Sequence, residues 1–267
     1  MTSSFRDTDT VAFEAIQVKS SGEPAHALHF GQDVAVPRKQ DPNDVIDQFQ
    51  AAASTSLELW TRMQEALPKS SLDLRKVASR DAFVRVAVEW ERFRSHWHIA
   101  AINRDSSLYR NSVTKRLRDS VKGGRFSQLE PYLHLALPPQ LSVSTVQTLL
   151  DPLGRNISFG DSWTDRARDD LAAPYGAKVT SLPLFDLRLV AACEKLRNAI
   201  AHMSTHSIAE LNSALLVLDP VVDGALVRTS RVTDKGIAAY LHARVGSEQR
   251  IEAWHRRLDE VAEKLRA

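Results

Sequence analysis

The stretch LDLRKVASRDAFVRVAVEWERFRSHWHIAAINR, residues 72–104, decides the fold class of this chain. Its 33 residues include neither glycine nor proline. Apolar side chains recur in it at steps of three and four residues, which is the spacing of one face of an α-helix. The stretch therefore predicts one long helix, with the apolar side chains Val77, Phe83, Val84, Val86, Ala87, Trp90, Phe93, Trp97, Ile99 and Ala100.

Helical patterns continue on both sides of this stretch. Residues 45–63 follow the same period, and we expect their helix to begin after Asp41-Pro42 and to end at Pro68. A short basic helix is predicted from Ser106 to Val121, because Gly123-Gly124 ends it.

The second half of the chain predicts several more helices. Prolines and glycines interrupt residues 126–180, so only short helices fit there, such as Ser142–Leu150 and Ser162–Leu171. A longer helix is predicted from Pro183 to about Met203, since proline is tolerated in a first turn. Its expected buried stripe is Leu189, Ala192, Cys193, Leu196, Ile200 and Met203. Two or three further helices are expected, at Ser207–Leu218, roughly Pro220–Val245, and Ser247–Arg266.

These patterns define the expected organisation of the chain. Residues 41–267 predict an all-α domain, a helical bundle with inserted short helices. Residues 1–40 show no sustained period and predict an irregular N-terminal extension, in which a short strand fits at Ala25–Phe30 or Val34–Val36. This extension could block a cleft, dock a partner or be disordered.

The composition excludes several classes of protein. Of the 267 residues, 43% are apolar and 25% are charged, which is ordinary for a soluble globular protein and excludes disorder of the whole chain. Cys193 is the only cysteine, which excludes a disulfide scaffold. No apolar run approaches 18 residues, and the start MTSSFRDTDT lacks the features of a signal peptide. We therefore expect a cytoplasmic protein without a membrane partner.

The positive charge is concentrated in one block. Residues 75–125 hold 13 Lys/Arg and five Asp/Glu, although the net charge of the whole chain is only +2. Such a block predicts either a surface that binds a polyanion or a solvated helix face neutralised by acidic segments elsewhere.

Common catalytic and metal-binding signatures are absent from the sequence. There is no CxxC pair, no HExxH, no Walker loop and no GxSxG. His96 and His98 are two residues apart, as are Glu89 and Glu91, so each pair diverges around a helix. We therefore expect no metal site and no cofactor.

The segment LRNAIAH, residues 196–202, is the strongest candidate for chemistry. Asn198 and His202 are four residues apart and share a helical face, and the long side chain of Arg197 can reach the same place. The cluster is expected at one edge of the apolar stripe, and such an edge could be a cleft or a subunit interface. Structural roles are also open. Arg197 could form an ion pair with Glu194 or Asp219. His202 could cap the helix near its C-terminus, where the helix dipole favours a cation, and Asn198 could be a buried polar residue that fixes helix register. Cys193, one turn earlier, is expected to be a small core residue.

LRNAIAH resembles the signature of the HEPN superfamily, whose ribonucleases carry Arg, four to six residues and then His. Residues 86–93, VAVEWERF, are similar to the WERF helix of RiboL-PSP-type HEPN proteins. The resemblance covers these two segments and says little about residues 1–70 or 206–267. In minimal HEPN toxins a Tyr lies two residues after the His, whereas this chain has Ser204 there, so regulation by nucleotidylation is not implied.

The resemblance implies a metal-independent endoribonuclease with Arg197, Asn198 and His202 as catalytic residues and Glu89 as a possible support for Arg197. It implies a homodimer in which two Arg197–His202 helices face each other, and a role as a toxin or phage-defence effector with a possible antitoxin or regulatory partner. We expect the basic residues Arg110, Lys115, Arg116 and Arg118 to rim the same cleft and bind RNA. The alternatives are a non-catalytic HEPN module that binds RNA or nucleotide or scaffolds a partner, and a purely structural helical protein.

Overall fold

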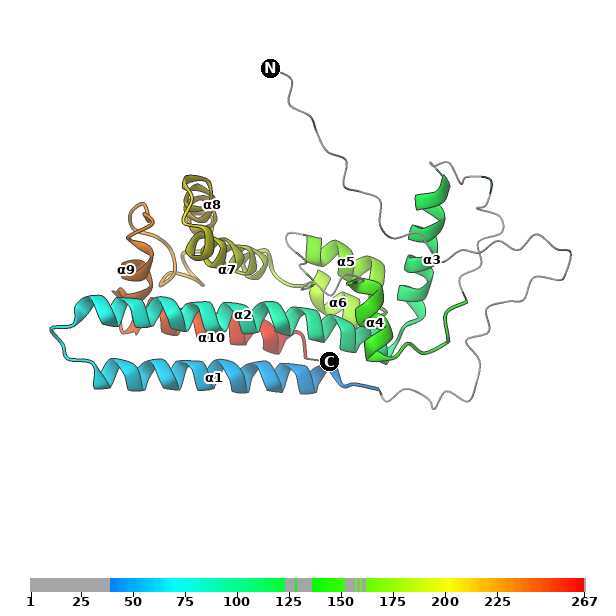
Figure 1. The fold of residues 1–267 in the computed structure, drawn as a ribbon, viewed down its shortest axis with the longest axis horizontal. Helices are drawn as coiled ribbons and strands as arrows, with labels where there is room; N and C mark the ends of the chain where they lie inside the picture. The colour runs from blue at the N-terminus through cyan, green and yellow to red at the C-terminus, as the bar shows by residue number, and fades with distance from the viewer. Residues whose placement is uncertain are drawn as a thin grey trace, which may run out of the picture. The chain divides into compact units, whose positions relative to one another are not determined.

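A computed structural model of the chain describes residues 39–122, 128, 136–151, 157, 159 and 162–266 (Figure 1). The chain divides into two units, Met1–Ala35 and Val36–Ala267, and all described residues belong to the second unit. The expected strand at Ala25–Phe30 or Val34–Val36, and nearly all of the expected extension, lie outside the described residues.

The described part of the chain is all-α, as predicted. Its helices are α1 (Pro42–Ala66), α2 (Leu72–Arg104), α3 (Ser107–Lys122), α4 (Val143–Leu150), α5 (Trp163–Asp170), α6 (Tyr175–Thr180), α7 (Leu184–His202), α8 (Thr205–Leu216), α9 (Ile237–His242) and α10 (Arg250–Lys264). Two short strands, β1 (Arg244–Val245) and β2 (Glu248–Gln249), pair antiparallel around Gly246, whose φ of 63° favours glycine. No helix among the described residues is long and apolar enough to cross a membrane.

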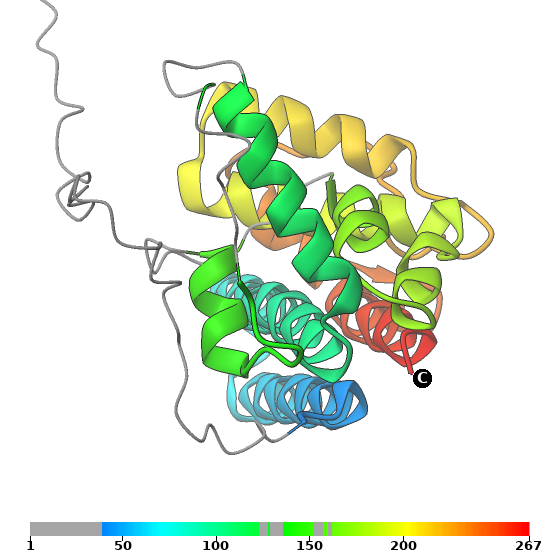
Figure 2. The ribbon, with the colours of Figure 1, turned by 90° about the vertical axis from the view of Figure 1, so that its right-hand side faces the viewer.

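Three long helices form the centre of the fold. The side chain of Asp41 caps α1 by accepting a hydrogen bond from the backbone N–H of Asn43 at 2.9 Å. Helix α1 packs along α2, and α10 packs against both, as the nearly end-on view in Figure 2 shows. The predicted bounds of α1 and α2 are confirmed to within two residues.

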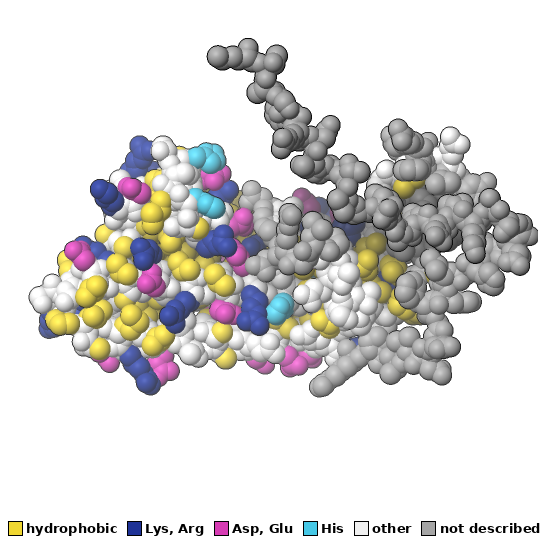
Figure 3. Space-filling view, in the orientation of Figure 1, with side chains coloured by type: hydrophobic (Ala, Val, Ile, Leu, Met, Phe, Trp, Pro, Cys, Tyr) yellow, Lys and Arg dark blue, Asp and Glu magenta, His cyan; other side chains and the backbone are white. Residues whose placement is uncertain are grey.

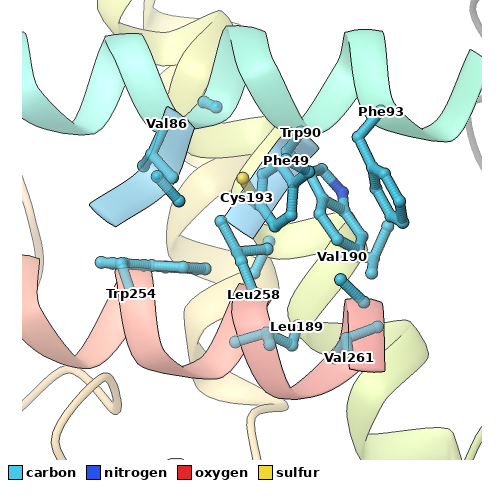
Figure 4. Packing of buried hydrophobic residues seen from close by; sticks show 14 of the residues in the cluster. Phe49, Val86, Trp90, Phe93, Leu189, Val190, Cys193, Trp254, Leu258 and Val261 are labelled. Carbon is cyan, nitrogen blue, oxygen red and sulfur yellow. The ribbon is translucent and has the colours of Figure 1, made fainter. Parts of the chain in front are cut away.

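Aromatic side chains fill the space between these helices and α7 (Figure 4). Phe49 of α1 stacks on Phe93 of α2 with ring centroids 4.9 Å apart, and Phe83 meets Trp254 of α10 edge to face at 5.4 Å. Burial of each large apolar side chain stabilises the fold by about 1.5–3 kcal/mol. Trp90, Phe93 and Trp97 are all buried, so the aromatic stripe of α2 belongs to the core.

The predicted helix at Pro220–Val245 is wrong. Only Ile237–His242 is helical there, and residues 217–236 form turns and irregular backbone. Gly224 approaches the carbonyl of Pro220 so closely that a Cβ would lie 2.6 Å from its oxygen. Side chains from neighbouring helices satisfy part of the backbone of this segment: Asn212 bonds to both N–H and C=O of Val232, and Arg250 donates to Ala225 O.

A buried cation ties this irregular segment to two helices. Arg257 of α10 is almost fully buried and donates to Asp223 at 2.7 Å and to Asp186, in the first turn of α7, at 2.9 Å. A buried charge requires such partners, so these contacts hold the start of α7 against α10.

Candidate functional site

The Arg-Asn-His segment lies at the end of α7. Helix α7 stops at His202 because Met203 adopts a left-handed conformation with φ 48°, and Ser204 then caps α8 through a reciprocal bond with Ser207. His202 is exposed, whereas Arg197 and Asn198 are half-buried. The three residues are thus accessible from solvent on the last turn and a half of the helix.

The opposite face of α7 is buried in the core. Leu189, Ala192, Cys193, Leu196 and Ala199 are buried, whereas Ile200 is only partly buried and Met203 is 56% exposed. The expected stripe is therefore wrong at its end, because the helix terminates before Met203 can turn inward. Burial raises the pKa of the Cys193 thiol to about 12, as expected for a small core residue rather than a nucleophile.

Arg197 is held on two sides. Its Nη1 donates to Oδ1 of Asn198 at 3.0 Å, and its Nε lies 3.5 Å from Oε1 of Glu91 on α2. The structure therefore pairs Arg197 with neither Glu194 nor Asp219, the two acids that the sequence suggested. Part of the guanidinium remains available, because the side chain is 35% exposed.

A second ion pair joins the same two helices in the reverse sense. Arg94 of α2 lies 3.6 Å from Glu194 of α7, and its guanidinium stands over the ring of Trp163. In the pair Glu91–Arg197 the acid comes from α2, whereas in the pair Arg94–Glu194 the acid comes from α7. The order of the two pairs along the helices shows that α2 and α7 run antiparallel where they cross. Together they fix α7 on α2 and set the position of Arg197.

The expectation that Glu89 supports Arg197 is corrected. Glu89 lies 4.0 Å from Arg92 on its own helix, and Glu91 is the acid beside Arg197. The two glutamates are two residues apart, so they point to different sides of α2. Only the position of α7, which the sequence does not give, selects between them.

The four basic residues expected to rim the site lie elsewhere. All are on α3, which packs against α5, and Figure 1 shows α4, α5 and α6 between α3 and the α7–α8 pair. Arg104 lies thirteen positions after Glu91 on α2, which is about 20 Å of helix before α3 begins. The predicted shared cleft is therefore wrong in its placement.

Two of these cations already have partners. Arg116 donates to Asp170 at 2.8 Å, and Arg110 donates to the carbonyl of Leu137 at 2.8 Å. Lys115 and Arg118 are exposed and form no ion pair with the described residues. They are the two members of the set that remain available to a phosphate.

The sequence did not reveal the buried cluster that anchors α3. Asp170 accepts hydrogen bonds from Ser112 and Arg116, and its other oxygen lies 3.8 Å from Nε2 of the buried His98. Burial lowers the pKa of His98 and outweighs the opposing effect of Asp170. The signal was the spacing of Trp163, Ala167 and Asp170, which puts Asp170 on the buried face of α5.

A second missed group lies on α8, beside the candidate site. Glu210 pairs with Lys195 of α7 at 3.1 Å and lies 3.7 Å from Nε2 of His206. His206 follows His202 by four residues across the turn, but its position beside α7 depends on how the two helices pack.

A cavity of about 510 Å³ lies between α1 and α10 and is lined by Glu248, Glu252, His255 and Asp259, among others. Its charged groups are largely engaged in local structure. Arg256 binds both oxygens of Glu248, and Glu252 accepts the N–H of Gln249 at the start of α10. Among the described residues, no three His, Cys, Asp or Glu side chains are placed to hold a metal ion.

The end of α7 thus combines a guanidinium held by two partners, an amide and an exposed imidazole. This set can bind a phosphate and transfer a proton without further groups. Comparison of the chain with protein-family models, with curated proteins and with solved structures found no match.

Proposed function

We propose that this protein is a metal-independent endoribonuclease of the HEPN type. The observation that carries the proposal is the accessible cluster of Arg197, Asn198 and His202, with Arg197 held by Glu91 from the WERF-like helix. The contact between the two segments that resemble HEPN proteins supports this proposal.

The chemistry uses a nucleophile that RNA itself provides. The 2′-OH attacks the adjacent phosphorus, and the 5′-oxygen leaves, which gives a 2′,3′-cyclic phosphate and a 5′-OH. His202 removes the proton from the 2′-OH or donates one to the leaving oxygen. Arg197 stabilises the charge on the phosphorane oxygens, and Asn198 orients Arg197. DNA lacks the 2′-OH and is not cleaved.

We further propose a homodimer that brings two α7 ends together. The outer face of α2 carries the apolar side chains of Leu74, Val77 and Val88, which are 57%, 37% and 44% exposed. Val77, Val88 and Glu91 lie on one helical face, so this apolar surface leads directly to the Glu91–Arg197 pair. Figure 3 shows apolar side chains gathered on the left of that face.

Cellular roles follow from the resemblance. We propose a cytoplasmic toxin or phage-defence effector that acts on RNA and is controlled by an antitoxin or another regulatory protein. The accessible location of the site agrees with control by a partner that covers it.

The test uses purified protein with total tRNA and a structured mRNA in the presence of EDTA. Wild type, His202→Ala and the control His96→Ala, an exposed position on α2, are compared, and the ends of the fragments are mapped. We expect cyclic-phosphate ends from wild type and the control and none from His202→Ala. RNA binding without cleavage by folded wild type would instead favour the non-catalytic binding module.

RNA binding by α3 has a separate test. Lys115→Glu with Arg118→Glu should weaken binding of a long single-stranded RNA and reduce the salt slope by about 1.4, since each phosphate contact contributes about 0.7. Arg116 is left unchanged because it anchors Asp170. An unchanged slope would remove α3 from the RNA-binding surface.

A further inference from the structure

Helices α7 and α8 pack as an antiparallel hairpin with a defined register. Arg188 Nη1 donates to the carbonyl of Val217 at 3.3 Å, and Lys195 pairs with Glu210 at 3.1 Å. From Arg188 to Lys195 the chain advances seven residues on α7, and their partners Val217 and Glu210 are also seven residues apart, in the opposite direction. Continued toward the connection, this register places His206 opposite Ala199, next to Asn198 and within one turn of His202.

The side chains concerned lie on matching faces of the two helices. Lys195, Asn198 and His202 are spaced by three and four residues and share one face of α7. Glu210 and His206 are four residues apart and share one face of α8. Because Lys195 and Glu210 are in contact, these two faces meet, and His206 lies on the same side of the hairpin as Asn198 and His202.

Glu210 is the acidic neighbour of His206 on α8. One carboxylate oxygen contacts Lys195, and the other lies 3.7 Å from Nε2 of His206. Nε2 of His206 is the ring nitrogen on the side of this carboxylate, and Nδ1 lies on the other side of the ring. An imidazole beside a carboxylate is a common catalytic arrangement.

Local structure gives His206 no other evident role. Its side chain is 84% exposed, and the caps of α8 are the side chains of Ser204 and Ser207. No aromatic contact or second ion pair of His206 exists among the described residues.

We propose that His206 is a second catalytic residue, the general base that complements His202 as general acid. The proposal rests on the ribonuclease function proposed above. Cleavage requires one proton to leave the 2′-OH and another to reach the 5′-oxygen, so it uses two groups, and His206 would supply the second from the same chain as His202. Nδ1 of His206 takes the proton as the bond from 2′-O to phosphorus forms. The imidazolium of His202 protonates the 5′-oxygen as its bond to phosphorus breaks.

The experiment compares two RNA substrates of the same sequence, cut at one mapped position. One has the natural 5′-oxygen there, and the other has a bridging 5′-sulfur, which leaves as a thiolate without a proton. Single-turnover rates are measured for wild type, His206→Gln, His202→Gln and the control His96→Gln. We expect His206→Gln to lose about 100-fold or more on both substrates, the usual scale of general base catalysis. His202→Gln should be slow on the oxygen substrate and recover on the sulfur substrate.

A pH profile and a second variant complete the design. Loss of the base should remove the rise in rate with pH on the acidic side, and Glu210→Gln should lower the rate with His206 still present. A His206→Gln rate within threefold of wild type overturns this assignment but leaves the ribonuclease proposal intact. A folded wild type that cuts no RNA overturns both.

Discussion

Arg197 and Arg94 lie at the same helix crossing, but their surroundings differ. Arg94 is 3% exposed and pairs with Glu194, so its charge serves the packing of α2 on α7. Arg197 is 35% exposed, and Asn198 and Glu91 hold it at the surface. A guanidinium that is both positioned and accessible can stabilise a developing charge with little reorganisation, which is what phosphoryl transfer requires.

Arg197→Lys tests whether the planar guanidinium matters beyond its charge. Lysine keeps the charge but cannot present two parallel N–H groups to a phosphate. We expect kcat/KM for RNA cleavage to fall by about 100-fold, with a larger loss in Arg197→Ala. Arg92→Lys, on the exposed part of α2, is the matched control. Full activity in Arg197→Lys would show that only the charge is used.

His255 predicts a pH dependence of stability. Burial lowers its pKa to about 4 in the folded state, although the carbonyls of Ala53 and Ala82 favour the charged form. Its ordinary value is 6.5, so the unfolded chain takes up the proton first as the pH falls. The stabilisation is therefore complete above pH 6.5 and decreases through the window from 6.5 to about 4, by roughly 3 kcal/mol.

Urea unfolding between pH 7.5 and 4 measures this effect. In His255→Gln the free energy of unfolding should decrease less with falling pH than in wild type, by roughly 3 kcal/mol over the window. His206→Gln removes an exposed imidazole and should keep the wild-type slope. Equal slopes in wild type and His255→Gln would contradict the assignment.

At the level of elements, the periodic helices were predictable and the contacts between them were not. The bounds of α1, α2 and α7 follow from apolar spacing, proline and glycine, which act locally. The helix predicted at Pro220–Val245 is wrong over residues 220–236, because the fold of this segment depends on Asn212, Arg250 and Arg257, which are remote in sequence or on other helices. The choice of Glu91 over Glu89, and the distance between α3 and α7, likewise depend on packing.

Substitutions in the two ion pairs between α2 and α7 should differ in their effects on the free energy of unfolding and on RNA cleavage. Arg94→Ala leaves Glu194 without its buried partner and should lower the free energy of unfolding by about 3 kcal/mol. Glu91→Gln affects a pair that is about one-third exposed and should cost less than about 1 kcal/mol, yet lower cleavage because Arg197 loses one support. Urea unfolding and cleavage rates, measured on both variants, check this. Equal losses of stability would contradict the distinction.

For the whole described part, α2 is the element on which the others are arranged. At about 50 Å it is long enough to contact α1, α10, α7, α9 and α4 at different points. Its residues are therefore buried on several sides, and the surface with Leu74, Val77 and Val88 stands out as its uncovered apolar part. This apolar surface ends at Glu91, so burial of the surface would affect the candidate site as well as the free energy of unfolding.

The proposed dimer interface can be tested at the surface formed by Leu74, Val77 and Val88. A second copy covering this surface would exclude water from Val77 and Val88, and two-fold symmetry would place every substitution in the interface twice. Wild type should therefore sediment at about twice 29.8 kDa. Val77→Glu with Val88→Glu should raise the dimer dissociation constant by about 100-fold or more, because unpaired carboxylates at an interface cost several kcal/mol. RNA cleavage should fall in parallel if the two α7 ends form one composite site.

Leu216→Glu, on the exposed face of α8, is the control and should remain dimeric. A wild type that sediments as a monomer, or a double variant that stays dimeric, would exclude this surface as the interface.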